Sequence, residues 1–506
     1  HEASLFTLDK GVVPVFVSSL QCKNCGSTYH LNYCRQQDPD GVERRHYYAG
    51  RPKVLQVETH VLIDSTVATL FKAQALHSQP QLTPCNSASA LAIMRIYNSA
   101  LSKESELPPT SQRPISLRNE YIWDTFYLDA LLQHHDEQHT TLVLLEHIPG
   151  NGRIQKDRLT HALEERNRFM EGTGQEYYAH ACDGCVRVTE NDGHFTTIHA
   201  AITDGVAVGR PCCGVHNCHQ PLPSIKARFC NQHQSRAGIC SIQECNNPVR
   251  PSTLTCHIPE HMEAEHAHQE KGKSMFTLAR RLLKHVSIDP VGTGLPGFES
   301  LAELIANEDS SCDNKSPEGN RRAKARFGRS WTHNEQLIVR PCGVIVARAT
   351  FYGAEAISSV ADMLRAVFPT LNSVPDILFY DNNCHLRRHL HAHNDTHFTN
   401  MGLPVDIFHY KTKHSEKDEY CGQHCNPLLF PDIYDVKTKT WFFNSSAAEQ
   451  TNVWFNGYHS IVHDMMGPRF DFFLDEMIKE RNRFLVASLE KEGKNPHLIP
   501  TEWLFQ

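Results

Sequence analysis

The sequence predicts a mixed α/β protein whose main domain is interrupted by a cysteine-rich insertion. Two strand-like runs, within residues 177–189 and 195–205, precede a segment dense in cysteine and histidine. A turn signal near residues 191–193 joins the two runs, and strands alternate with helices after the dense segment. One interrupted domain explains this order more simply than two independent domains, which are the alternative.

The composition suits a soluble globular protein, with 40 % hydrophobic and 21 % charged residues among 506. No run of about 18 uncharged apolar residues occurs, so neither a transmembrane helix nor a membrane partner is predicted. The first residues lack a basic start and a long apolar stretch, which argues against a secretory signal; what precedes His1 is left open. The net charge of −7 does not indicate a nucleic-acid partner, so that inference must come from local features.

Composition shifts divide the chain into five segments. Apolar residues at three- and four-residue spacing after His60 predict helices, and helices are also predicted at 155–172, 262–286, 355–367 and from Ala447. Strands are predicted at 337–349, 376–380 and 403–408. The segments are an N-terminal cysteine cluster (1–60), a helical region (61–175), the first part of the core (176–209), a cysteine/histidine insertion with a polar linker (210–335), and the second part of the core with C-terminal helices (336–506).

Half of the 18 cysteines fall into two clusters that also contain histidine, and this grouping favours zinc over disulfides. Disulfide frameworks do not need histidine, whereas tetrahedral zinc is typically bound by mixed thiolate and imidazole ligands. We therefore expect a reducing, intracellular setting. The clustered cysteines are Cys22, Cys25 and Cys34, and Cys213, Cys218, Cys230, Cys240, Cys245 and Cys256.

The insertion contains an internal repeat, and each copy offers the four ligands of a closed structural zinc site. The two copies are Cys213-x4-Cys218-x11-Cys230-x2-His233 and Cys240-x4-Cys245-x10-Cys256-x4-His261. Loops of this length contain too few apolar residues for a core of their own, so bound metal would supply much of their folding free energy. Cys212 and His257 are alternative ligands that the spacing leaves open.

Two further ligand sets are less complete. The N-terminal set is a Cys-x2-Cys half-site with a third cysteine and one of two histidines: Cys22, Cys25 and Cys34, with His30 or His46. The other set lies late in the chain: His409, His414, Cys421 and Cys425. Phosphate contact or simple packing is the alternative role for its histidines.

Three acidic residues stand where a two-metal site for phosphodiester chemistry would need them. Such a site uses carboxylates from different elements to hold two Mg²⁺ or Mn²⁺ ions about 4 Å apart. Asp183 lies on the first strand-like run, Asp381 ends the buried run DILFYD, and Glu449 lies near the start of the last helical region. An acid at a strand end is usually a solvated turn residue, so the prediction rests on the three together.

Several stretches resemble the KDZ (Kyakuja–Dileera–Zisupton) transposases. They are YDNNC, DIFHYKTKH and NSSAAEQTN, in this order. The runs GRPCCGVHNC and VPVFVSSLQCKNCGSTYHLNYC resemble cysteine clusters associated with these enzymes, so the likeness covers most of residues 11–460. KDZ transposases are DDE enzymes. The resemblance implies an RNase H-like mixed-sheet catalytic core, DNA strand cleavage and transfer on transposon ends and target DNA, and a nuclear location.

Carried over by position, the second and third acids of the family fall on Asp381 and Glu449. Asp183 is the preferred first acid; Asp204, which follows the second strand-like run, is its rival. The alternative function is a domesticated, non-catalytic zinc protein that binds DNA or chromatin, and a zinc-dependent ubiquitin ligase or histone reader ranks last. Association with a second copy of the chain is left open.

Overall fold

The structure is a computed structural model of the chain. It describes residues 1–77, 90–101, 116–146, 158–191, 194–270, 325–412 and 419–506. The chain divides into two compact units, one formed by His1–Pro211 with Thr332–Gln506 and the other by Cys212–Trp331. Within the described ranges, the helices lack the combination of length and apolar character needed to cross a lipid bilayer.

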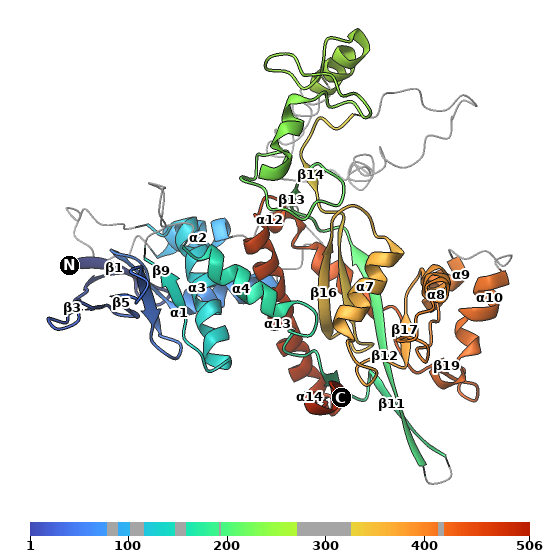
Figure 1. Cartoon of the computed structure of the whole chain (residues 1–506). Coiled ribbons are helices and arrows are strands. Elements are labelled where there is room, and N and C mark those ends of the chain that lie inside the picture. The colour runs from blue at the N-terminus through green and yellow to red at the C-terminus, as the bar shows by residue number, and fades with distance from the viewer. Residues whose placement is uncertain (78–89, 102–115, 147–157, 192–193, 271–324, 413–418) are drawn as a thin grey trace, which may run out of the picture. The chain divides into compact units, whose positions relative to one another are not determined.

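The N-terminal part of the larger unit is built from two sheets (Figure 1). One has the strand order β2-β1-β8-β7 and the other the order β3-β4-β5-β6-β9. The strands are β1 (Glu2–Thr7), β2 (Gly11–Phe16), β3 (Leu20–Gln21), β4 (Thr28–Tyr29), β5 (Tyr33–Gln37), β6 (Glu43–Tyr47), β7 (Val54–Glu58), β8 (Val61–Asp64) and β9 (Val143–Leu145).

The cysteines of the N-terminal cluster lie among strands and not in a helical region, and the helical region expected at 61–175 begins with a strand. Leu62 and Ile63 were assigned to the first helix, but they lie on β8, which pairs in parallel with β1 and antiparallel with β7. Three successive residues of β8, Val61, Leu62 and Ile63, are buried, so both faces of the strand are covered and it lacks the apolar–polar alternation that would distinguish it from a helix. The helices that follow are α1 (Ser65–His77), α2 (Ala90–Ala100), α3 (Asn119–Glu137) and α4 (Thr160–Met170).

The central sheet of the larger unit has the strand order β11-β12-β15-β16. The remaining strand, β17, pairs with the edge of β12 opposite β15. Its strands overlap the runs predicted within 177–189 and 195–205 and at 376–380, while the single run predicted at 337–349 forms two strands, β15 and β16, joined by a turn. The elements are β10 (His180–Ala181), β11 (Val186–Asn191), β12 (His194–Val206), β15 (Asn334–Val339), β16 (Ile345–Phe351), α7 (Ile357–Val367), β17 (Ile377–Phe379) and α8 (Asn383–Ala392).

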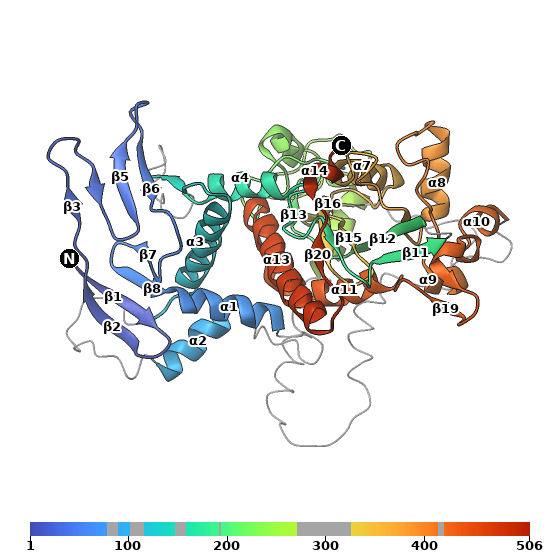
Figure 2. The same cartoon turned by 90° about the horizontal axis from the view of Figure 1, so that it is seen from below.

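The long strand β12 changes partner along its length. Its first half pairs with β11 as a hairpin that extends away from the rest of the sheet (Figures 1 and 2). Its second half pairs antiparallel with β15, from Ile202↔Val339 to Val206↔Glu335, while residues 200–202 pair in parallel with β17. The first strand of the central sheet is thus β12, and the segment around Asp183, which was expected to be that strand, precedes the hairpin.

Helices cover both faces of the central sheet. Ile377 and Phe379 of β17 belong to a core cluster that includes residues of α11 and α13, and the alternate residues Leu378 and Tyr380 pack with α7 and α8. Side chains of a strand point alternately to its two faces. An acid an even number of residues from Phe379 therefore faces α11 and α13, and one an odd number away faces α7 and α8.

The C-terminal region is largely helical, as predicted from Ala447 onward. The predicted strand at 403–408 is wrong: the structure has only a bridge between Ile377 and Gly402 there, followed by a helix. The elements are α9 (Ile407–Thr412), α10 (Glu419–His424), the 3₁₀ turns η4 (Pro427–Leu429) and η5 (Pro431–Ile433), β18 (Tyr434–Asp435), β19 (Thr440–Trp441), α11 (Ala447–Asn456), α12 (His459–Val462), α13 (Gly467–Lys491), β20 (His497–Leu498) and α14 (Thr501–Leu504).

The smaller unit lies in the sequence between β12 and β15. Most of the predicted helix at 262–286 and of the polar linker lies outside the described residues, although residues 259–270 are helical. The elements at this part of the chain are β13 (Pro211–Cys212), the 3₁₀ helix η3 (Asn231–Gly238) and β14 (Ser330–Trp331).

Buried charges on α13 join the N-terminal helices to the central sheet. Glu476, only 1 % exposed, accepts hydrogen bonds from Lys72 Nζ of α1 at 2.9 Å and from Arg166 Nη2 of α4 at 3.1 Å. The neighbouring Asp475 accepts two hydrogen bonds of 2.9 Å from Arg348 of β16. Burial opposes the charged form, but the cations outweigh it and lower the pKa of Glu476 to about 2.

We predict that Glu476→Ala lowers the free energy of unfolding by about 3–5 kcal/mol, because it leaves two buried cations without their partner. Chemical denaturation measures the change. Glu490→Ala on the exposed end of the same helix is the control and should shift stability by less than about 0.5 kcal/mol. Because the pKa of Glu476 is depressed in the folded state, its contribution is present at neutral pH and lost as the pH falls from about 4.5 to about 2. A loss of stability equal to that of the control would contradict this role.

Candidate active site and metal-binding clusters

The pairing between β12 and β17 brings two acids together. The strands are parallel, with Ala200 opposite Ile377 and Ile202 opposite Phe379. Two residues further along both strands stand Asp204 and Asp381, so these side chains continue the face of the sheet that α11 covers. Adjacent strands are about 4.8 Å apart, which makes the two carboxylates close neighbours. Both line one small pocket.

Helix α11 supplies the third acid. Ala447 and Ala448 are buried against the sheet, and Glu449, the next residue, lines the same pocket as Asp204 and Asp381. One turn later Asn452 donates a hydrogen bond from Nδ2 to Asp204 Oδ2 at 2.8 Å. The same helix therefore provides one carboxylate and orients another.

A histidine holds Glu449 in place. His409 Nε2 lies 3.1 Å from Glu449 Oε1, and His409 Nδ1 lies 3.2 Å from Asp406 Oδ2. Asp406 also accepts hydrogen bonds from the backbone N–H groups of Phe408 and His409, both at 3.1 Å, which fixes the start of α9. The imidazole thus bridges two carboxylates, and its ring nitrogens set the position of Glu449.

The acids repel one another. Burial, followed by the charges of Asp381, Glu355 and Glu449, raises the pKa of Asp204 to about 7, although the N–H of Gly205 opposes the shift. Burial also raises the pKa of Glu355, which accepts a 2.8 Å hydrogen bond from the Tyr380 hydroxyl. A bound cation would offset the repulsion among the carboxylates that line this pocket.

The oxygen atoms around this pocket suit a hard divalent cation. Mg²⁺ and Mn²⁺ prefer carboxylate oxygens, and Asp204, Asp381 and Glu449 supply them from three different elements. Asp406 Oδ1 lies buried without a hydrogen-bond partner among the described residues. An unpaired buried carboxylate oxygen is costly, and a cation or its water would satisfy it.

Asp183 does not belong to this group of acids. It lies in the turn between Cys182 and Cys185, where its N–H donates to the Lys494 carbonyl at 3.0 Å. Its Oδ2 accepts a 2.8 Å hydrogen bond from Asn495. The placement of Asp183 beside Asp381 and Glu449 is therefore corrected: the rival Asp204 occupies that position, because β12 and not the segment before β11 is the central strand.

Some residues at this pocket are not predicted from the sequence alone. Asp406 and His409 were visible in DIFHYKTKH, but only His409 was considered, as part of a different ligand set. Asn452 stands in NSSAAEQTN, and its spacing of three from Glu449 on a helix indicates the same face. Cys182-x2-Cys185, with His180 just before it, was read as part of a strand, although this spacing is itself typical of a metal-binding turn.

Both repeats of the insertion gather the ligands expected of them. In the first, His233 Nδ1 lies 3.5, 3.4 and 3.3 Å from the Sγ atoms of Cys213, Cys218 and Cys230. The four ligand atoms of the second repeat, on Cys240, Cys245, Cys256 and His261, also lie within 4.8 Å of one another. Each four-residue cluster has the donor set of a closed tetrahedral zinc site and could hold one ion.

In the part of the chain that the structure describes, the ligands of the N-terminal set and of the late His/Cys set are not brought together as expected. Among the described residues, no group of three or more ligand atoms within 4.8 Å includes Cys22, Cys25 and Cys34, so a zinc site there stays a prediction. His46, one proposed fourth ligand, directs Nε2 to Asp38 at 3.0 Å. In the late set, His409 lies at the acidic pocket, Cys421 and Cys425 are buried beside Cys384, and His414 lies outside the described residues.

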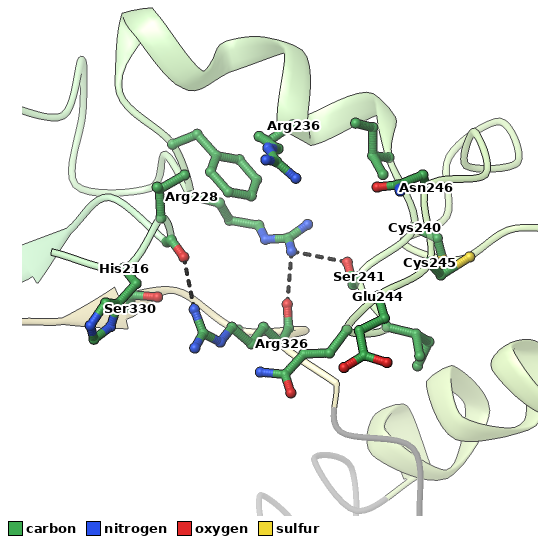
Figure 3. Close-up of a pocket in the computed structure, with 17 residues that line it drawn as sticks. His216, Arg228, Arg236, Cys240, Ser241, Glu244, Cys245, Asn246, Arg326 and Ser330 are labelled. Carbon is green, nitrogen blue, oxygen red and sulfur yellow. Dashed lines mark hydrogen bonds between the residues drawn. The ribbon is translucent and has the colours of Figure 1, made fainter. Parts of the chain in front are cut away.

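A pocket of about 310 Å³ in the smaller unit lies between the two repeats and is lined by three arginines (Figure 3). Arg228 donates from Nη2 to Ser241 Oγ at 3.0 Å and to the Arg326 carbonyl at 2.8 Å. Arg326 donates to the Gly214 carbonyl at 3.1 Å, and Arg236 points into the same space. Burial lowers the pKa of the Arg228 guanidinium, so an anion in this pocket would relieve a partly desolvated charge.

We predict that Cys230→Ser and Cys256→Ser each remove one zinc ion per chain and that the double variant loses two, because the repeats have separate ligand sets. Elemental analysis of the purified protein measures the zinc content. Ser241→Ala, in the pocket between the repeats, is the control and should leave the zinc content unchanged. Retention of both ions in the double variant would exclude these clusters as zinc sites.

Two models of known families match the chain, and both describe cysteine clusters. Residues 1–101 match a CxC5-like cysteine cluster associated with KDZ transposases. Residues 202–267 match a CxC6-like cysteine cluster associated with KDZ transposases. No curated protein and no solved structure matches the chain. The two clusters predicted from their cysteine patterns are thus confirmed, and the two matches support a KDZ-family protein.

Proposed function

We propose that this protein is a DDE transposase that cleaves and transfers DNA strands with Asp204, Asp381 and Glu449. The convergence of these three acids on one pocket is the observation that carries the proposal. The association of both cysteine clusters with KDZ transposases supports it independently. Asp204 takes the place that the sequence analysis gave to Asp183.

The topology of the central sheet supports an RNase H-like core. Across the sheet the strands follow the order β16-β15-β12-β17. The first three are antiparallel neighbours, and β17 pairs in parallel with the edge of β12 opposite β15. The resemblance to DDE enzymes implies such a mixed sheet, with its first acid on the first strand. Asp204 stands on β12, Asp381 stands two residues after the end of β17, and Glu449 lies on the helix packed against them.

The residues have separate roles in this proposal. Two divalent cations held by the acids would activate the attacking water or 3′-hydroxyl and stabilise the leaving oxygen. Asn452 fixes the orientation of the Asp204 carboxylate, and His409 fixes that of Glu449. These contacts pre-organise the carboxylates before DNA arrives, which matters because small displacements in such sites are costly in rate.

The insertion is the proposed DNA-contacting part. Structural zinc in its two repeats would hold short loops rigid, and the pocket between them presents Arg228, Arg236 and Arg326 to an anion. Guanidinium groups bind phosphate through paired hydrogen bonds. A DNA substrate in turn implies that the protein is located in the nucleus.

We predict that Asp204→Asn, Asp381→Asn and Glu449→Gln each lower the rate of DNA cleavage at least about a hundredfold, which corresponds to about 2.7 kcal/mol of lost transition-state stabilisation. Nicking of supercoiled plasmid DNA in Mg²⁺ or Mn²⁺ measures the rate. Asp183→Asn makes the same chemical change on an exposed acid and should keep the wild-type rate.

The outcomes of this experiment separate the alternatives. Loss of activity in Asp183→Asn with activity kept in Asp204→Asn would restore the original assignment of the first acid. If the wild-type chain binds DNA but neither cleaves it nor binds Mg²⁺ or Mn²⁺, the domesticated, non-catalytic zinc protein becomes the better description.

We also predict that Arg228→Gln, Arg236→Gln and Arg326→Gln weaken DNA binding to a similar extent for unrelated sequences, because phosphate contacts position DNA and do not discriminate bases. Each lost contact should reduce the slope of log K against log salt by about 0.9. Fluorescence anisotropy at several salt concentrations gives both quantities. Arg95→Gln, on an exposed face of α2, removes the same charge elsewhere, and an equal effect there would argue against the pocket.

A further inference from the structure

A second kind of Cys/His cluster lies in the larger unit, away from the cysteine-rich insertion in sequence. It consists of His180, Cys182, Cys185 and Cys342. Neither family model places a cysteine cluster on these residues, since one match ends at residue 101 and the other covers 202–267. The acids of the proposed active site are not among its members.

The spacing of the four ligand atoms fits one tetrahedral ion. The Sγ atoms of Cys182 and Cys185 are 3.5 Å apart, and His180 Nε2 lies 3.3 Å from Cys342 Sγ. All four ligand atoms lie within 4.8 Å of one another. Zinc–sulfur bonds of about 2.3 Å and zinc–nitrogen bonds of about 2.0 Å in a tetrahedron place neighbouring ligand atoms about 3.5–3.8 Å apart. A disulfide would need about 2.05 Å between the sulfurs, so these thiols are spaced for an ion instead.

The backbone around the first two cysteines forms a tight metal-binding turn. The Cys182 carbonyl accepts hydrogen bonds from the N–H groups of Cys185 and Val186, both at 3.0 Å. The N–H of Cys182 donates to Cys185 Sγ at 3.2 Å. A donor aimed at sulfur stabilises a thiolate, which is the form that binds zinc.

Burial also distinguishes this cluster from scattered cysteines. His180, Cys182 and Cys185 are 1, 2 and 1 % exposed, and Cys342 is half-buried. Val344 and Leu489 pack around the thiols in a small apolar cluster of their own. Three thiols and an imidazole in a closed, dry environment are typical of structural zinc and leave no position for substrate.

We propose that His180, Cys182, Cys185 and Cys342 bind a structural zinc ion that links the two parts of the interrupted core. The first three ligands precede β12, and Cys342 lies in the turn between β15 and β16, which follows the insertion. The ion therefore closes the chain across the whole cysteine-rich insertion, with His180 and Cys342 separated by 162 positions. Because the ion binds the folded chain, its binding free energy adds to the stability of the folded state and holds the turn before β11 against the turn between β15 and β16. This proposal is independent of catalysis.

The test is the zinc content of the purified protein. Cys342→Ser should lose one zinc ion per chain relative to wild type, and a variant that also carries Cys230→Ser should lose two. Cys342→His, which keeps a ligand, should retain the ion. The control Leu489→Ala disturbs the same apolar cluster but no ligand, so it should lower the melting temperature while keeping the zinc content.

Alkylation of the wild-type protein gives a second measurement that does not depend on the folding of variants. Mass spectrometry should find Cys182, Cys185 and Cys342 protected in zinc buffer and modified at least tenfold faster once a chelator is added. Equal zinc content in wild type and Cys342→Ser, or equal alkylation rates with and without chelator, would overturn the proposal. A disulfide between Cys182 and Cys185 in the freshly purified protein would overturn it as well.

Discussion

The register between β12 and β17 is the constraint on which the candidate site depends. Ile202 faces Phe379 across a parallel pair, and the acids stand two residues beyond on both strands. A slip by one residue would turn one acid to the opposite face, toward α7 and α8 and away from Glu449. Residues on both faces of β17 pack into hydrophobic clusters, so a slip would require both clusters to repack, and the same side chains that form the core also align the acids.

Helix α13 plays a comparable part for the larger unit. Asp475 and Glu476 are buried in it and are paired with cations from α4, α1 and β16. Apolar packing alone would tolerate several orientations of these elements, whereas hydrogen-bonded charges are satisfied in only one. Arg348 of β16, the strand next to β15, binds Asp475 of α13. The central sheet and the N-terminal helices are therefore both held by the buried acids of α13.

Local patterns predicted part of this structure, and long-range pairing explains what they missed. Asp381 and Glu449 can be proposed from the sequence because each is marked by its own neighbours, an apolar run and the start of a helix. Asp183 was preferred over Asp204 because the sequence does not show that β12 leaves β11 and continues with β15. The ligands in the two repeats are close in sequence, so spacing revealed them. The cluster with Cys342 depends on a contact across 162 positions, which spacing cannot reveal.

The insertion leaves β12 and returns to β15 at strand ends that are direct neighbours, with Val206 opposite Glu335. Thr332 continues this pairing by donating its N–H to the Arg210 carbonyl at 2.9 Å, and the N–H of Arg210 donates to the Thr332 hydroxyl at 3.1 Å. In topological terms the insertion occupies the loop of a β-hairpin, a position that tolerates very different loop lengths. A segment at such a position can be replaced by one of different length and composition without altering the pairing of β12 with β15.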